Sequence, residues 1–177
     1  MGVRCRTKEL GLIRKAAAAL SLAFAATAAG AGAAGATPEV PATPESCPAV
    51  PADRVDDAVS RLPQAFPDVP WKVTGSGSSV DCALNWVQVD PDGATGSSPT
   101  HILLFDHFKY GSTATEDPEA FVNVAGSDAP GQITITFRWL NPGDPNANPT
   151  GRADVRYQLF PQSPPGPIDP IPPEVTG

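Results

Sequence analysis

The sequence has few basic residues and few histidines. Its 177 residues hold 12 Lys and Arg against 19 Asp and Glu, a formal net charge of −7, and only two histidines. A protein that binds nucleic-acid phosphates needs an excess of positive charge, so this composition argues against a nucleic-acid partner. A zinc centre needs three or four spaced His, Cys or acidic ligands. No such set is present, and we expect neither a metal nor another cofactor.

Cysteine is also scarce, but its placement is informative. Cys5 lies in the N-terminal region, and only Cys47 and Cys82 lie beyond it. Two cysteines in an exported chain are typical of a disulfide, because compartments outside the cytoplasm are oxidising. We therefore predict a Cys47–Cys82 bridge. Two reduced, buried thiols are the alternative.

The longest hydrophobic run stands near the N-terminus. Five basic residues within the first 15 precede an apolar run from Ala16 to Ala29, and Ala34-Gly35-Ala36 follows as a small-residue stretch. This order is typical of a secretory signal peptide, predicted at residues 1–36. Cleavage is expected after Ala36, with alternatives after Ala33 and Ala31. An uncleaved membrane anchor is the other interpretation.

Removal of residues 1–36 changes the expected surface of the protein. It takes away five basic residues and one acidic residue and leaves a 141-residue chain with a formal net charge of −11. No cysteine directly follows the small residues, so we predict no lipid anchor at that point. We expect a secreted or envelope-associated protein without a transmembrane segment in its mature form.

Proline marks the two ends of the predicted domain. Residues 37–46 hold three prolines and no periodic pattern, so an extended linker is predicted there. Residues 161–177 hold seven prolines, so a disordered, polyproline-like tail is predicted. Residues 47–160 remain for a single domain.

The domain is expected to begin with a short amphipathic helix. Val55, Ala58, Val59 and Leu62 are spaced to share one helical face. Asp57 and Arg61 are spaced to pair across one turn, and Pro63 is expected to end the helix.

The rest of the domain has the periodicity of short strands. Residues 81–89 change the parity of their apolar positions, which indicates a bulge or a strand buried on both faces. Residues 102–105 form a continuous apolar run, and residues 133–139 alternate apolar with polar side chains. Short neighbouring strands favour an antiparallel meander. We predict an α+β fold in which a single N-terminal helix, clipped by the disulfide, packs on one antiparallel sheet of five or six strands.

Three stretches together carry a resemblance to a known family. They are residues 80–87 (VDCALNWV), 98–105 (SPTHILLF) and 110–115 (YGSTAT). In order and spacing they resemble the LppP/LprE lipoproteins of actinobacteria, over about residues 47–160. The resemblance implies an exported cell-envelope protein. It implies no catalytic residues, and the missing lipobox cysteine departs from the family pattern.

No motif for catalysis or metal binding is present, and we predict no catalytic residues and no enzymatic activity. His101 is expected on a strand surface and His107 in a turn beside Asp106. The loop with Asp144 imitates the start of a calcium loop but lacks its glycine and glutamate.

Three hypotheses for function follow. The first is a non-enzymatic envelope protein that binds a lipid or another envelope component in an apolar pocket beside Trp86 and Trp139. The second is an envelope-acting hydrolase that uses Asp106 and His107 as a polar pair. The third is a protein-interaction module that presents the proline-rich tail.

Overall fold

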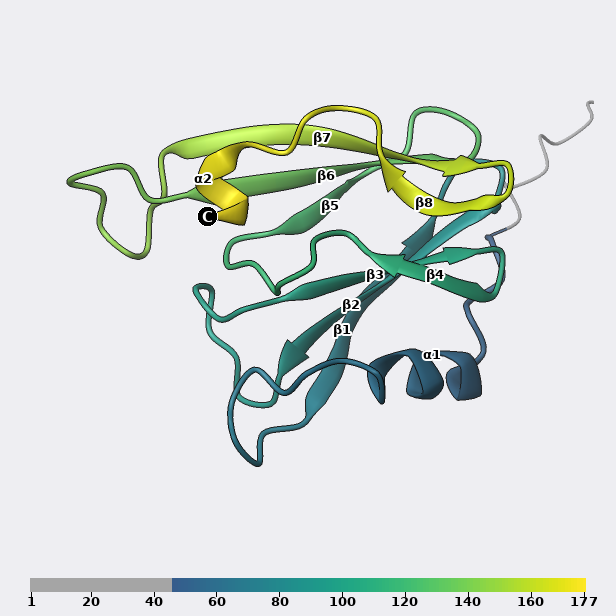
Figure 1. Ribbon diagram of the computed structural model, residues 1–177, viewed down its shortest axis with the longest axis horizontal. Coiled ribbons are helices and arrows are strands. Elements are labelled where there is room, and N and C mark those ends of the chain that lie inside the picture. Colours follow the sequence, from purple (N-terminus) through teal and green to yellow (C-terminus); the bar gives the residue numbers. More distant parts are fainter. Residues whose placement is uncertain (1–45) are drawn as a thin grey trace, which may run out of the picture. The chain divides into compact units, whose positions relative to one another are not determined.

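The computed structural model describes residues 46–177 (Figure 1). The predicted signal peptide lies outside the described residues, as does the predicted linker except for its last residue. Among residues 46–177, neither helix has the length and hydrophobicity that a bilayer-spanning segment requires.

The first half of the described chain forms one helix and a four-stranded antiparallel sheet whose strands pair in chain order. Helix α1 ends at Val59, so the prediction that it continues through Leu62 to Pro63 is wrong. A turn follows it, in which the Arg61 amide donates to the Ala58 carbonyl. The elements are α1 (Ala52–Val59), β1 (Trp71–Ser78), β2 (Leu84–Pro91), β3 (His101–Asp106) and β4 (Lys109–Thr113).

The second half forms another four-stranded antiparallel sheet, also in chain order. Its longest pairing, between β6 and β7, has an unbroken register from Gln132 opposite Gln158 to Trp139 opposite Gly151. The elements are β5 (Asn123–Gly126), β6 (Gln132–Trp139), β7 (Gly151–Phe160), β8 (Ser163–Pro167) and α2 (Pro173–Thr176).

The inner faces of the two sheets share one hydrophobic core. Leu84 of β2 and Leu104 of β3 lie in the same buried cluster as Ile135 of β6 and Tyr157 of β7. A second cluster on the outer face of the first sheet joins Val55 and Ala58 of α1 to strand residues. Residues 46–177 therefore form three layers, with α1 outside the first sheet and the second sheet on its other side (Figure 1).

Both faces of β2 and β3 are buried, which explains their sequence patterns. Ile102 and Leu104 face the inner core, whereas Leu103 and Phe105 face α1. The bulge lies in β1 instead, where the register shifts between Val73 and Gly75. For residues 81–89, the second interpretation, a strand buried on both faces, agrees with the structure.

The predicted fold class is wrong. Residues 46–177 form eight strands in two separate sheets, not five or six strands in one sheet beneath a helix. After β4 the chain makes one isolated bridge, in which Glu119 pairs with Thr100. It then leaves the first sheet and begins a second meander. Sequence periodicity describes each strand alone, and does not reveal which neighbours fail to pair.

The proline-rich C-terminal segment differs from the predicted disordered tail. Residues 163–167 form edge strand β8, a position that tolerates proline because outward-facing amides are not required for pairing. Arg156 donates from its side chain to both carboxylate oxygens of Asp169 (2.7 and 2.8 Å), and from its amide to one of them. Val175 of α2 is buried in the inner core. The tail is therefore part of the folded domain.

Candidate functional site

The first wall of the candidate site is the exposed face of α1 next to its buried face. Burial of Val55 and Ala58 fixes the rotation of this helix. Arg54, Asp57 and Arg61 recur at three- and four-residue spacing, so they lie together on a neighbouring face. As predicted, Arg61 pairs with the Asp57 carboxylate, at 2.6 Å.

The opposite wall comes from the β3–β4 hairpin. Asp106 pairs with Lys109, which leaves His107 and Phe108 as the two turn residues. His107 has a positive φ of 53°, in the left-handed region that such tight turns require. The turn brings Phe108, Lys109 and Tyr110 opposite α1. Together the two walls enclose a cavity of about 380 Å³, here called the basic cleft, lined by Arg54, Asp57, Arg61, Phe108, Lys109 and Tyr110.

The basic cleft contrasts in charge with the rest of the domain. Residues 46–177 carry seven basic and sixteen acidic side chains. Three of those basic residues meet here with one acidic residue, so the lining itself carries two net positive charges. Asp53, outside the lining, lies 3.7 Å from Arg54. Among the described residues, Lys109 has no carboxylate within salt-bridge distance. Its ammonium group is therefore available to a ligand.

Tyr110 forms an aromatic wall of the basic cleft. The Tyr110 ring packs edge-on against Phe105, with 5.7 Å between centroids, and the Arg61 guanidinium lies 5.9 Å from the Tyr110 centroid. Burial raises the pKa of the Tyr110 hydroxyl, and the nearby Arg61 charge opposes that rise. The phenol is therefore neutral at physiological pH and offers both a hydrogen-bond donor and an acceptor.

A second cavity of about 290 Å³, here called the hairpin cleft, adjoins the first and shares Lys109 and Tyr110 with it. Its far wall is the β7–β8 turn, where Phe160 pairs with Ser163 and Gln162 has a positive φ of 67°. Its other lining residues are Asp106, Gly111, Phe160, Gln162, Ser163, Pro164 and Pro165.

A close seam between β4 and β8 fixes the hairpin cleft. The Ser112 hydroxyl donates to the Pro165 carbonyl at 2.7 Å. Gly111 lies so close to the Pro165 ring that a Cβ there would overlap it. The two strands lie at facing edges of the two sheets (Figure 1).

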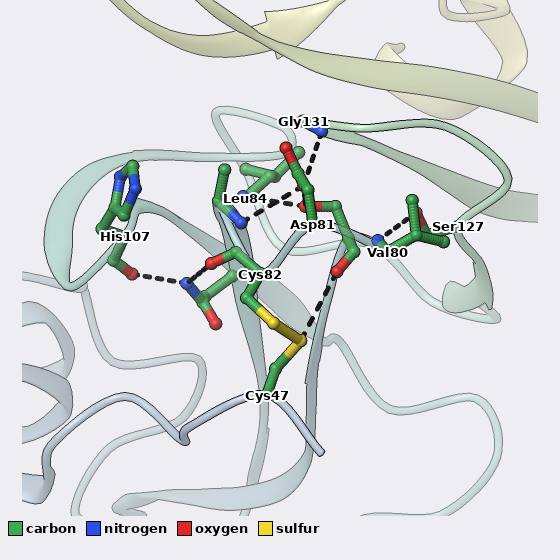
Figure 2. The surroundings of a disulfide bond; sticks show 11 residues. Cys47, Val80, Asp81, Cys82, Leu84, His107, Ser127 and Gly131 are labelled. Carbon is green, nitrogen blue, oxygen red and sulfur yellow. Dashed lines mark hydrogen bonds between the residues drawn. A yellow bond between two sulfur atoms is a disulfide. The ribbon is translucent and has the colours of Figure 1, made fainter. Parts of the chain in front are cut away.

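The predicted disulfide is present between Cys47 and Cys82, with their Cα atoms 5.3 Å apart. Cys82 occupies the turn between β1 and β2, with a φ of 62°. In the same turn, one Asp81 carboxylate oxygen accepts from the Ser79 hydroxyl (2.5 Å). The same oxygen accepts from the Gly131 amide (2.8 Å), as Figure 2 shows. These hydrogen bonds lower the pKa of Asp81. The bridge thus ties the segment before α1 to a turn that also holds the second sheet.

Trp86 and Trp139 occupy similar places in different sheets. Trp86 lies over Gly77 of β1, and Trp139 lies over Gly151 of β7. Trp86 also lines a cavity of about 150 Å³ with Cys47 and its neighbours. An apolar cavity of about 230 Å³ lies nearby, between the start of α1 and β1–β2. A lipid pocket beside both tryptophans stays a prediction.

The two histidines have different surroundings. His107 lies in the turn, and its Nδ1 is 2.8 Å from an exposed Asp106 carboxylate oxygen. The expectation of an exposed His101 is wrong, because its ring is buried against Trp71 with centroids 5.2 Å apart. Neither ring nitrogen is hydrogen-bonded to another described residue. Burial lowers the pKa of His101, so the ring is neutral.

The calcium-like loop is closed by its own hydrogen bonds. The Asp144 carboxylate accepts from the amides of Asn141 and Thr150, both at 2.8 Å. Its oxygens therefore organise the turn. Within residues 46–177, no three His, Cys, Asp or Glu side chains are grouped as metal ligands.

Sequence reasoning missed most of the residues that line the two clefts. The spacing of Arg54, Asp57 and Arg61 on the predicted helix was an available signal for one wall. The approach of Phe160 and Gln162 to Lys109 had no such signal, because it depends on the meeting of β4 with β8.

The fold and clefts define a two-sheet, disulfide-bonded domain with two ligand-sized cavities at one end. The family model described as LppP/LprE lipoprotein matches residues 76–162. Proteins named as lipoprotein LppP in Mycobacterium bovis and Mycobacterium tuberculosis (strain H37Rv) are each 31% identical over 110 residues, which is 61% of this chain and 61% of each relative. The resemblance to the LppP/LprE lipoprotein family is therefore confirmed. The chain spans less than two thirds of the length of these relatives, and no solved structure matches it.

Proposed function

We propose that this chain is an exported, non-enzymatic protein of the cell envelope that binds an anionic envelope component in the basic cleft. The observation that carries the proposal is the convergence of Arg54, Arg61 and Lys109 around one cavity of an otherwise acidic domain. Preformed cavities with a few placed polar groups are the usual sites for small ligands.

Export is supported by the N-terminal pattern of residues 1–36, and an envelope location by the relatives named as lipoproteins. We propose that the mature chain acts without a lipid attached directly after that pattern. A lipid ligand of the two cavities near α1 is less favoured, because their volumes of about 230 and 150 Å³ are smaller than that of the basic cleft.

The charge distribution favours an isolated anionic group over a densely charged surface. The described domain is strongly acidic, and like charges repel over about 8 Å at physiological ionic strength. An anionic bilayer would be repelled by most of this surface. A single phosphate or carboxylate on an otherwise neutral molecule would instead reach the three cations without that repulsion.

Native mass spectrometry of the protein purified from its own envelope tests the proposal. The wild-type chain is expected to carry an anionic adduct of defined mass. Arg61→Gln and Lys109→Gln are expected to lose most of it, because a hydrogen bond to a charged group contributes about 1.5–3 kcal/mol.

Arg152→Gln is the matched control, since Arg152 and Arg61 are similarly exposed and each pairs with an aspartate. It should retain the adduct. A wild-type chain without an adduct, or equal retention or loss across the three variants, would contradict the proposal.

A hydrolase remains the second candidate because Asp106 and His107 form a hydrogen-bonded pair. Among the described residues, no Ser, Thr or Cys side chain is hydrogen-bonded to the His107 ring. His107→Ala should therefore leave the cellular role of the protein intact, because His107 lines neither cleft. Loss of that role, with folding unchanged, would favour the enzyme.

A further inference from the structure

The basic cleft continues into a lining of different chemistry. Lys109 and Tyr110 border both cavities, so the two linings meet at β4. The hairpin cleft contributes no further cation. Its new polar side chains are one carboxylate, one amide and one hydroxyl, from Asp106, Gln162 and Ser163.

These polar groups are available to a ligand. Neither the Gln162 amide nor the Ser163 hydroxyl is hydrogen-bonded to another residue that the structure describes. The Asp106 carboxylate uses one oxygen for His107, which leaves the other free to accept. The set therefore offers donors and acceptors side by side.

An aromatic ring lies beside them. Phe160 is 37% exposed, so part of its side chain is open to solvent. Tyr110 is half-buried and borders the same cavity. An aromatic face next to mixed donors and acceptors matches a molecule that has C–H groups on one side and hydroxyl groups around its edge.

We propose that the ligand is a saccharide that bears an anionic group. The anion binds Arg54, Arg61 and Lys109, and the sugar ring lies in the hairpin cleft against Phe160, with hydroxyls paired to Gln162 and Asp106. This inference rests on the proposed anionic ligand and specifies its class. An acyl chain in the hairpin cleft would leave the same amide and carboxylate without partners, which is unfavourable.

Calorimetric titration of the purified chain tests the inference with four defined probes. They are glucose 1-phosphate, glucuronate, inorganic phosphate and glucose. At least one of the two anionic sugars is expected to bind ten-fold or more tightly than both phosphate and glucose. Glucose 1-phosphate and glucuronate separate a phosphate source of the charge from a carboxylate source.

Variants assign the two parts of the affinity. Gln162→Gly removes the amide at a position whose positive φ suits glycine, so folding should be preserved. Gln162→Gly and Phe160→Ala together should reduce the ratio of anionic-sugar affinity to phosphate affinity by about ten-fold. They should leave the affinity for phosphate unchanged. Arg61→Gln should weaken both probes, and Arg152→Gln neither.

The outcomes separate this inference from the proposed function. If phosphate binds as tightly as the anionic sugars, and Arg61→Gln weakens it, the anionic cleft stands and the saccharide inference fails. If none of the four probes binds, or if glucose binds as tightly as the anionic sugars, the saccharide inference is overturned. The anionic adduct sought by native mass spectrometry then tests the proposed function separately.

Discussion

The two sheets have the same connectivity but different coverage. Each is a four-stranded antiparallel meander in chain order. The first is buried on both faces at β2 and β3, because α1 covers its outer side. The second exposes its outer side, where Arg138, Asp154 and Arg156 alternate with buried residues. Strand periodicity therefore reports what covers a sheet, and does not report how many sheets there are.

The largest expected effect comes from the outer core of the first sheet. Phe105→Ala should lower the free energy of unfolding by about 3–5 kcal/mol, because this β3 side chain is completely buried against Tyr110 and α1. Gln158→Ala, on the outer side of the second sheet, should change it by less than about 0.5 kcal/mol. Urea unfolding of both variants measures the contrast. Equal losses would show that the two outer faces are equivalent.

The disulfide comes next in expected effect. Cys47→Ser should lower the free energy of unfolding by up to about 4 kcal/mol, because a bridge across 35 positions restricts the unfolded chain. Thermal unfolding should show a markedly lower Tm. The double variant Cys47→Ser with Cys82→Ser should resemble the single variant. Two titratable thiols in the native wild-type protein would contradict the bridge.

The seam between the sheets should be sensitive to one methyl group. Gly111→Ala places a Cβ against the Pro165 ring and should cost about 1–3 kcal/mol of unfolding free energy. Gly96→Ala is the control, because a Cβ there meets nothing within 4 Å and its φ is not in the left-handed region. Equal stability of the two variants would contradict the prediction, because it would show that β4 and β8 can separate at little cost.

The smallest effect concerns the ion pair that fixes the C-terminal segment. Hydrogen bonds from Arg156 hold the pKa of Asp169 at about 2, below the value of about 3.9 expected in the unfolded chain. The stability from this pair is therefore present above about pH 4 and is lost as the pH falls toward 2. Asp169→Asn should lower the Tm at pH 7, and the difference from wild type should shrink by pH 2. A difference that is constant with pH would contradict the assignment.

Much of the local structure could be predicted from the sequence. The spacing of Val55 and Ala58 predicted α1 and its buried face, and the Asp57–Arg61 pair followed from it. The continuous apolar run at residues 102–105 is typical of a strand covered on both faces, and His107 was expected in the turn beside Asp106, where the structure places it. These features depend on neighbours within a few residues, so periodicity and turn chemistry were sufficient.

The candidate site was mostly beyond sequence reasoning. Gln162 and the prolines of β8 lie in the segment predicted as a disordered tail, because proline cannot donate in a strand ladder. Their order comes from pairing with β7, from the Arg156–Asp169 contact and from the seam with Gly111. Each of these contacts joins parts of the chain that a local pattern does not relate.

The sequence alone determined the acidic composition, the family resemblance, the pairing of two cysteines and the amphipathic helix, because each follows from composition or short spacing. Only the tertiary structure decided that the strands divide into two sheets and that β4 and β8 meet. Those outcomes depend on the burial of two facing apolar surfaces against each other, which is a property of the whole folded chain. The clefts at their meeting point exist for the same reason.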